Sequence, residues 1–151
     1  MTTTSCASRR TTARCPPGAD LTRADLNSAN LTRADFSRAN LTGAGLFNAD
    51  LTGAFFFKAN LNSAYLFEAN LTGVRIGGAD LTDANFASAD LTSAYLFAAN
   101  FTRANFDGAN LTDARWPATE PVPEEGWMWD GESGRLKRAG QLSEVTDHYL
   151  W

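Results

Sequence analysis

Apolar and polar positions alternate along this chain with a strict period of five between residues 19 and 118. The first residue of each unit is alanine, except at Val74, and the third residue is always apolar, from Leu21 to Trp116. The residue between them is most often Asp or Asn. Apolar positions recur about every 3.6 residues in an amphipathic helix and every two in a half-buried strand, so a period of five fits neither. The pattern therefore predicts a repeat architecture.

A unit of five residues is too short to form a supersecondary element alone, so several units must close one turn of a solenoid whose stacked turns share a core. Phenylalanine follows the central residue at positions 47, 57, 67 and 97, whereas Thr or Asn stands there at positions 42, 52, 62, 72, 92 and 102. This alternation indicates an even number of units per turn. Four units would make a square coil of twenty residues, and five such coils would make a rod about 24 Å long at the spacing of β-strands.

The twenty units resemble the repeats of the pentapeptide repeat family, and the resemblance covers 100 of the 151 residues. It implies an all-β solenoid, a right-handed quadrilateral β-helix in which the central Leu or Phe and the preceding small residue point inward. Packing favours the same orientation, because only a side chain as small as alanine fits beside leucine inside so narrow a coil.

Taking every fourth unit together defines four faces of the predicted coil. Face one has the central residues Leu21, Leu41, Leu61, Leu81 and Phe101; face two has Leu26, Leu46, Leu66, Phe86 and Phe106; face three has Leu31, Leu51, Leu71, Leu91 and Leu111; and face four has Phe36, Phe56, Ile76, Leu96 and Trp116. These faces organise every later comparison between residues.

The sequence divides into a leader, residues 1–18, the repeats, residues 19–118, and a tail, residues 119–151. We interpret the leader as a flexible segment that caps the first coil near Cys15. Cys6 and Cys15 would suit a disulfide or a metal clip, but two thiols without a nearby histidine fall short of a zinc site, and cytosolic thiols are normally reduced. The leader lacks an apolar signal segment and the chain lacks a long apolar run, so we expect a cytoplasmic protein without membrane contact.

The tail predicts a hairpin, with Trp127 and Trp129 on one strand, Leu136 on the other and residues 130–134 between them. Apolar residues then recur at helical spacing and indicate a short terminal helix. Because the end of a solenoid exposes core and unpaired backbone, we expect the tail to cap the rod or to join two copies in a dimer. The residues assigned to capping or dimerisation are Trp116, Trp127, Trp129, Leu142, Val145, Tyr149 and Trp151.

Charge and chemistry exclude several functional classes. The formal net charge is −4, and no basic stripe suited to phosphate contacts is present, so we expect no direct binding of nucleic acid. The single histidine, His148, has no cysteine nearby, and no serine elbow, phosphate-binding glycine loop or metal motif occurs. We therefore expect no catalysis, no metal and no cofactor.

The second residue of the units on faces one and three alternates between Asp and Asn without two vertically adjacent aspartates. Such side chains suit hydrogen bonds to local backbone rather than a cation ladder. Threonine columns follow on the same faces. An ice-binding array is one interpretation, and the other is that β-branched threonine suits a half-exposed strand position.

Faces two and four depart from this pattern in outward positions. The candidate partner-binding residues are Phe47, Tyr65 and Phe67 on face two, and Phe55, Phe57, Arg75, Gly77, Gly78, Tyr95 and Phe97 on face four. Exposed aromatic side chains that gather in one area mark contact surfaces. On face four the glycines predict a notch beside Arg75 that receives a side chain of a dimer mate, another partner or the chain's own tail.

These features favour a noncatalytic scaffold that binds a protein partner through faces two and four. The family resemblance implies an alternative, a mimic of DNA that protects or inhibits DNA gyrase, often as a dimer. The rod departs from that pattern, because it is short and only weakly acidic and lacks inserted loops. A small-molecule binder or enzyme that uses Arg75 is a further alternative. A fold alone does not determine which function applies.

Overall fold

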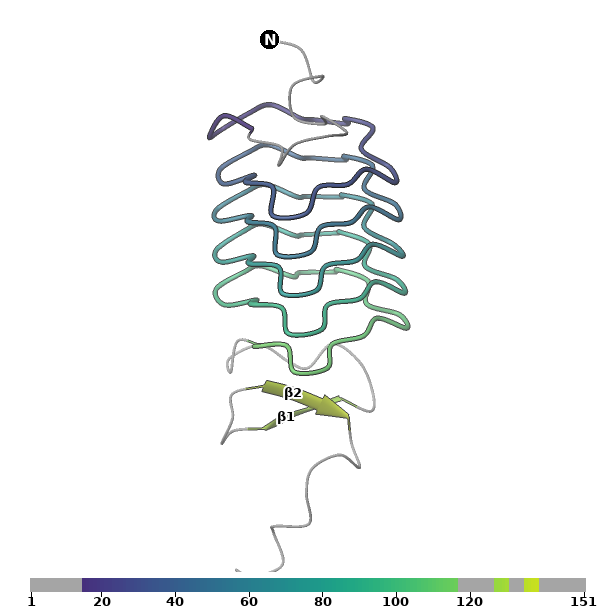
Figure 1. The fold of residues 1–151 in the computed structure, drawn as a ribbon. Helices are drawn as coiled ribbons and strands as arrows, with labels where there is room; N and C mark the ends of the chain where they lie inside the picture. Colours follow the sequence, from purple (N-terminus) through teal and green to yellow (C-terminus); the bar gives the residue numbers. More distant parts are fainter. Residues whose placement is uncertain (1–14, 117–126, 131–134, 139–151) are drawn as a thin grey trace, which may run out of the picture.

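A computed structural model describes residues 15–116, 127–130 and 135–138 of the chain. Parallel β-bridges join residues twenty apart in sequence, from Asp20 with Asn40 to Tyr95 with Arg115. Each turn of the chain therefore takes twenty residues, and the turns stack into the rod shown in Figure 1. The turn therefore contains four units, which agrees with the even number of units per turn that the alternation of phenylalanines indicates and with the square coil expected from it.

Backbone hydrogen bonds connect each coil to the next. On face three, for example, the Leu51 N–H donates to the Asn70 carbonyl over 2.8 Å, and the Gly53 N–H donates to the Thr72 carbonyl over 2.9 Å. Between successive units of one coil, the Ala54 N–H donates to the Leu51 carbonyl over 2.9 Å. The same pattern recurs along the rod, so one backbone conformation is repeated at every side of the coil.

The fifth residue of each unit forms the corner between two faces. Every such residue from Gly18 to Asp113 has a φ between 52° and 77°, in the left-handed region. Glycine adopts this conformation without a steric cost, which explains the glycines at five of the later corners, 43, 53, 73, 78 and 108. The remaining corners are occupied by residues with side chains, which carry the cost of the left-handed conformation.

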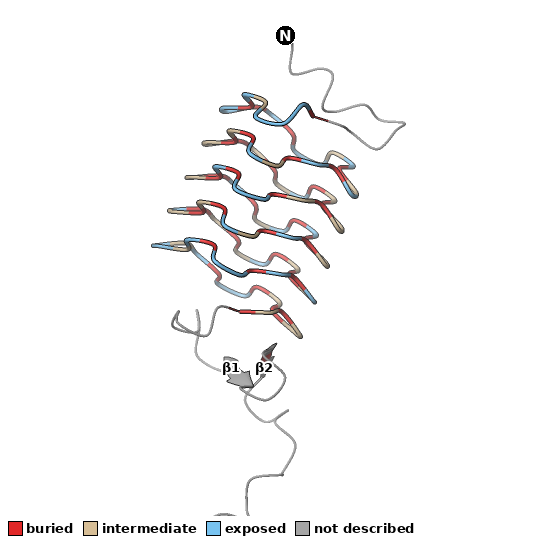
Figure 2. Ribbon diagram, turned by 90° about the vertical axis from the view of Figure 1, so that its left-hand side faces the viewer, coloured by how far each residue is buried: buried red, intermediate tan, exposed pale blue. Residues whose placement is uncertain are grey.

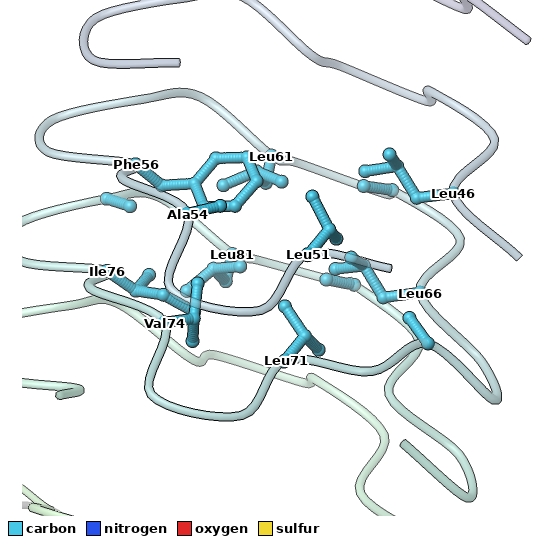
Figure 3. Packing of buried hydrophobic residues seen from close by; sticks show 14 of the residues in the cluster. Leu46, Leu51, Ala54, Phe56, Leu61, Leu66, Leu71, Val74, Ile76 and Leu81 are labelled. Carbon is cyan, nitrogen blue, oxygen red and sulfur yellow. The ribbon is translucent and has the colours of Figure 1, made fainter. Parts of the chain in front are cut away.

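The interior of the rod consists of the first and third residues of the units. All central side chains from Leu21 to Trp116 are buried except Phe101, which is half-buried. Figure 3 shows Leu51 above Leu71 and Phe56 above Ile76, so that like positions stack from coil to coil. Aromatic rings stack in the same way, with centroids 5.0 Å apart for Phe36 and Phe56. Figure 2 shows buried positions recurring along every coil.

Two strands follow the rod, β1 (Trp127–Asp130) and β2 (Arg135–Arg138), which pair antiparallel with Trp129 opposite Leu136. The Leu136 side chain is fully buried. Its N–H donates to the Ala114 carbonyl over 2.8 Å, and its carbonyl accepts the Asp113 N–H over 3.0 Å. In earlier coils the next coil supplies these partners. Leu136 therefore completes the last coil on face three as a sixth coil would.

Cys15 lies in the core at the other end of the rod and is disulfide-bonded. This differs from the expectation of reduced thiols, which rested on the expected compartment, because sequence spacing alone does not tell whether two sulfurs meet. Residues 1–14 of the leader, which include the other cysteine, Cys6, lie outside the described residues. So does the expected terminal helix with Leu142, Val145, Tyr149 and Trp151.

Candidate binding site on face four

The outward Asp and Asn side chains at the second repeat position make hydrogen bonds within their own units. All fourteen units with Asp or Asn at the second position use its Oδ1 to accept the backbone N–H two residues later, over 2.8–3.2 Å. We call this contact the Asx bond. The expectation of local hydrogen bonding is confirmed. Among the described residues no group of three potential metal ligands occurs.

Threonine hydroxyls on faces one and three reinforce the Asx bond. The Thr52 hydroxyl donates to Asp50 Oδ1 over 2.6 Å, and this contact is the main reason why the pKa of Asp50 lies below its ordinary value. Seven other threonines, at positions 22, 42, 72, 82, 92, 102 and 112, make the same contact. Each of these hydroxyls already donates its hydrogen within its own unit, which explains threonine here without any ligand.

Face one also carries an ion pair that sequence reasoning missed. The Arg103 guanidinium donates two hydrogen bonds of 2.6 Å to the Asp83 carboxylate, which lies one coil above it at the same repeat position. The hydrogen bond lowers the pKa of Asp83. Both side chains are largely exposed, so the pair contributes little to stability. The twenty-residue spacing of the two residues was the signal in the sequence.

On face two the Phe47 and Phe67 rings stack with centroids 4.4 Å apart, and each side chain is half-buried. Tyr65 is 53% exposed. Gly45 replaces the usual Asp or Asn, and the Asn27 amide from the coil above supplies the missing acceptor to the Phe47 N–H over 2.9 Å. A Cβ at Gly45 would lie 2.9 Å from Asn27 Oδ1, so glycine makes room for this substitute acceptor.

Face four contains a hollow of about 450 Å³. Its lining residues are Phe55, Phe57, Arg75, Gly77, Tyr95 and Phe97. Gly77 lies one coil from both Phe57 and Phe97, each of which is 49% exposed. A Cβ at Gly77 would lie 3.6 Å from the Phe57 ring, so the absent side chain opens the hollow. Gly78 is instead a corner residue with a φ of 67°.

Arg75 lies between two aromatic rings of the same column. Its Cζ is 5.2 Å from the centroid of Phe55 and 5.6 Å from that of Tyr95. The Cζ atom of Arg115, one coil further on, lies 4.9 Å from the centroid of the Tyr95 ring. Cation–π contacts of this kind hold the guanidinium plane while its edges stay available for hydrogen bonds. Arg115 was not among the predicted site residues, although it shares its repeat position with Arg75.

The predicted partner-binding residues thus fall into two groups. Six of the seven face-four residues line one hollow. The other group, Phe47, Tyr65 and Phe67, lies on face two, which is separated from face four by face three on one side of the coil and by face one on the other. The aromatic side chains were expected to point outward, yet Phe47, Phe55 and Phe67 are only half exposed because neighbouring coils cover their ring faces. The side chains of Trp127 and Trp129 lie outside the described part of the structure.

Trp116, which was assigned to capping or dimerisation, is buried and stacks on Phe101 with centroids 5.0 Å apart. It therefore belongs to the core of the last coil. In the part of the chain that the structure describes, no helix has the length and apolar character needed to span a bilayer.

Comparisons with solved structures identify similar rods. A pentapeptide repeat protein from the Arabidopsis thaliana thylakoid lumen is 35% identical, with a TM-score of 0.65 over 67% of this chain and 70% of that chain. A pentapeptide repeat protein from Nostoc is 39% identical, with a TM-score of 0.57 over 66% of this chain and 81% of that chain. QnrB1, a plasmid-mediated fluoroquinolone resistance protein, is 22% identical with a TM-score of 0.29 over 67% of this chain and 62% of that chain, a likeness too weak for a functional argument.

No curated protein matches the sequence. The family profile described as pentapeptide repeats, however, matches residues 19–56, 44–83 and 79–115, with eight copies. These ranges span nearly the whole of the rod that the twenty-residue bridges define. The chain belongs to the pentapeptide repeat family.

Proposed function

We propose that the protein is a noncatalytic scaffold that binds a protein partner through the hollow on face four. The observation that carries this proposal is the pair of half-exposed rings, Phe57 and Phe97, on either side of Gly77. Solvent-exposed aromatic side chains around a concave surface gain free energy when a partner side chain covers them. On face three of this chain the same outward position holds threonine in every unit.

A catalytic role has less support. The carboxyl groups with lowered pKa values, Asp20, Asp50 and Asp83, belong to faces one and three. Their pKa values are lowered mainly by hydrogen bonds from threonine hydroxyls or, for Asp83, from the arginine of the ion pair. The described residues around the hollow include aromatic rings and one arginine but no carboxylate, thiol or imidazole. Convergent acid–base groups, which most reactions need, are therefore missing from this lining.

The gyrase alternative is also less well supported. A mimic of DNA needs an acidic surface, whereas face four carries the bases Arg38, Lys58, Arg75 and Arg115 against the single acid Asp35. A supercoiling assay with and without a quinolone tests this alternative directly. Gyrase activity that is unchanged at micromolar protein would exclude it.

Affinity capture from extracts of the cells that make this protein tests the scaffold proposal. The wild type is compared with a Phe57→Ser, Phe97→Ser double variant and with Tyr65→Ser, which removes an equally exposed ring from face two. We expect the face-four variant to lose a partner that the wild type and Tyr65→Ser both retain. Identical partner lists for all three proteins would refute the proposal.

A further inference from the structure

Face four lacks the Asx bond over three consecutive coils. Its second positions hold Phe55, Arg75 and Tyr95 in place of Asp or Asn, so no side-chain oxygen reaches the N–H two residues later. One coil above, Asp35 Oδ1 still accepts the Ser37 N–H over 2.9 Å. Within the described residues, the N–H groups of Phe57, Gly77 and Phe97 have no acceptor. On face two, Asn27 supplies the acceptor for the Phe47 N–H, and the Phe67 N–H has none among the described residues, so consecutive unfilled donors occur on face four.

These three N–H groups belong to residues that line the hollow. They repeat at the coil spacing, about 4.8 Å apart, and point to the side of the strand on which an Asx oxygen lies in other units. A row of backbone donors in a concave surface is a site for anionic oxygen atoms. The hollow thus combines apolar walls with backbone N–H groups that have no acceptor.

Charge points to the same kind of ligand. Face four has four bases against one acid, whereas face two has the acids Asp25, Glu68 and Asp107 and no base. Arg75 stands beside the donor row, held between two rings, and the ion pair between Asp83 and Arg103 is the one found among the described residues. Arg75 therefore has no carboxylate partner in this part of the chain.

We propose that the hollow binds an acidic peptide segment in which a carboxylate lies next to an aromatic side chain. The carboxylate accepts the Gly77 N–H in place of the missing Asx oxygen and pairs with Arg75. The aromatic ring lies over Gly77 between Phe57 and Phe97, where the absent side chain leaves room for it. This inference rests on the proposed function, because it names the chemistry of the partner that the same hollow receives.

A titration of the full chain followed by amide resonances tests the inference. The probe is the peptide acetyl-Gly-Glu-Trp-Glu-Gly-amide, and two matched peptides replace both Glu by Gln or the Trp by Ala. We expect the acidic aromatic peptide to shift the Gly77 amide proton downfield and to bind about tenfold more tightly than either matched peptide. Added salt should weaken its binding.

Two variants locate the site. Gly77→Thr introduces the most frequent residue at this repeat position and fills the hollow. Arg75→Asn rebuilds the Asx bond, so that the Gly77 N–H is already occupied. Both should abolish peptide binding while the thermal midpoint is kept or raised. Ala87→Thr is the control, since it adds the same side chain at the same repeat position on face two. It should bind the peptide like the wild type.

Equal affinity for the Glu and Gln peptides, or resonance shifts confined to face two, would overturn the inference. So would a wild-type dimer that Gly77→Thr converts to a monomer, because a second copy would then occupy the hollow. These outcomes leave the scaffold proposal standing if cellular capture still depends on Phe57 and Phe97. Loss of that dependence would instead refute the scaffold proposal itself.

Discussion

On face three every central side chain is leucine, and the outward threonines are held by the Asp or Asn two residues before them. On face four the inner residues are equally buried, but the outward positions hold Phe57, Gly77 and Phe97 beside a cation between two rings. The two faces therefore share one interior and one backbone register. What differs is whether the outward groups have hydrogen-bond partners within their own face. This difference distinguishes a face with a structural role from a face that can bind a ligand.

The largest expected effect tests the shared interior. Phe56→Ala on face four and Leu51→Ala on face three each empty a buried position, and each should lower the free energy of unfolding by about 2–5 kcal/mol. Phe57→Ala, one residue along the chain, should change it far less because that ring is half exposed. Urea titrations followed by circular dichroism measure all three. Similar losses for Phe56 and Phe57 would show that the outer ring also supports the fold.

The next largest effect is a difference in stability between variants at two glycines, one at a corner and one in the hollow. Gly73 is a corner residue on face three with a φ of 64° and no atom within 4 Å of an added Cβ, so Gly73→Val should cost about 1–2 kcal/mol through backbone strain alone. Gly77 on face four has no left-handed φ, and Gly77→Thr should change the free energy of unfolding by less than about 0.5 kcal/mol. Thermal melts distinguish the two roles. Equal costs would mean that Gly77 serves the backbone rather than the hollow.

A smaller effect concerns the Asx bond, which one variant removes from face three and another introduces on face four. Asn70→Ala on face three removes the acceptor of the Thr72 N–H and hydroxyl, and it should cost about 1 kcal/mol. Arg75→Asn on face four supplies such an acceptor and should slow hydrogen exchange at the Gly77 amide. Exchange that is unchanged in this variant would show that Gly77 N–H is not available to an Asx oxygen.

The smallest expected effect is a dependence on pH. Because the hydrogen bond from Thr52 lowers the pKa of Asp50 in the folded state, the folded protein holds its proton less tightly there than the unfolded chain does. The resulting stabilisation is present above the ordinary aspartate pKa and is lost as the pH falls through the lowered value. Asp50→Asn should remove this part of the acid sensitivity. Unfolding curves between about pH 2 and pH 6, a window that extends below the ordinary aspartate pKa, measure it.

Much of the rod could be predicted from the sequence, because a solenoid satisfies each position by contacts at a fixed spacing. The apolar third positions, from Leu21 to Trp116, indicated the interior, and the alternation of Phe47 and Phe57 with threonines indicated an even number of units per turn. The glycines at positions 43 and 53 also marked the left-handed corners, a signal that was present in the sequence and overlooked.

The amino-acid sequence by itself determined the period, the inward residues and which side chains share a column, since all three follow from counting along a regular backbone. Only the tertiary structure decided how neighbouring coils complete one another. It showed that Asn27 supplies the acceptor missing at Gly45, that Leu136 takes the place of a sixth coil, and that Arg75 lies between two rings. Such contacts depend on the position of the end group of a side chain. The repeat pattern specifies only the position of the backbone from which the side chain extends.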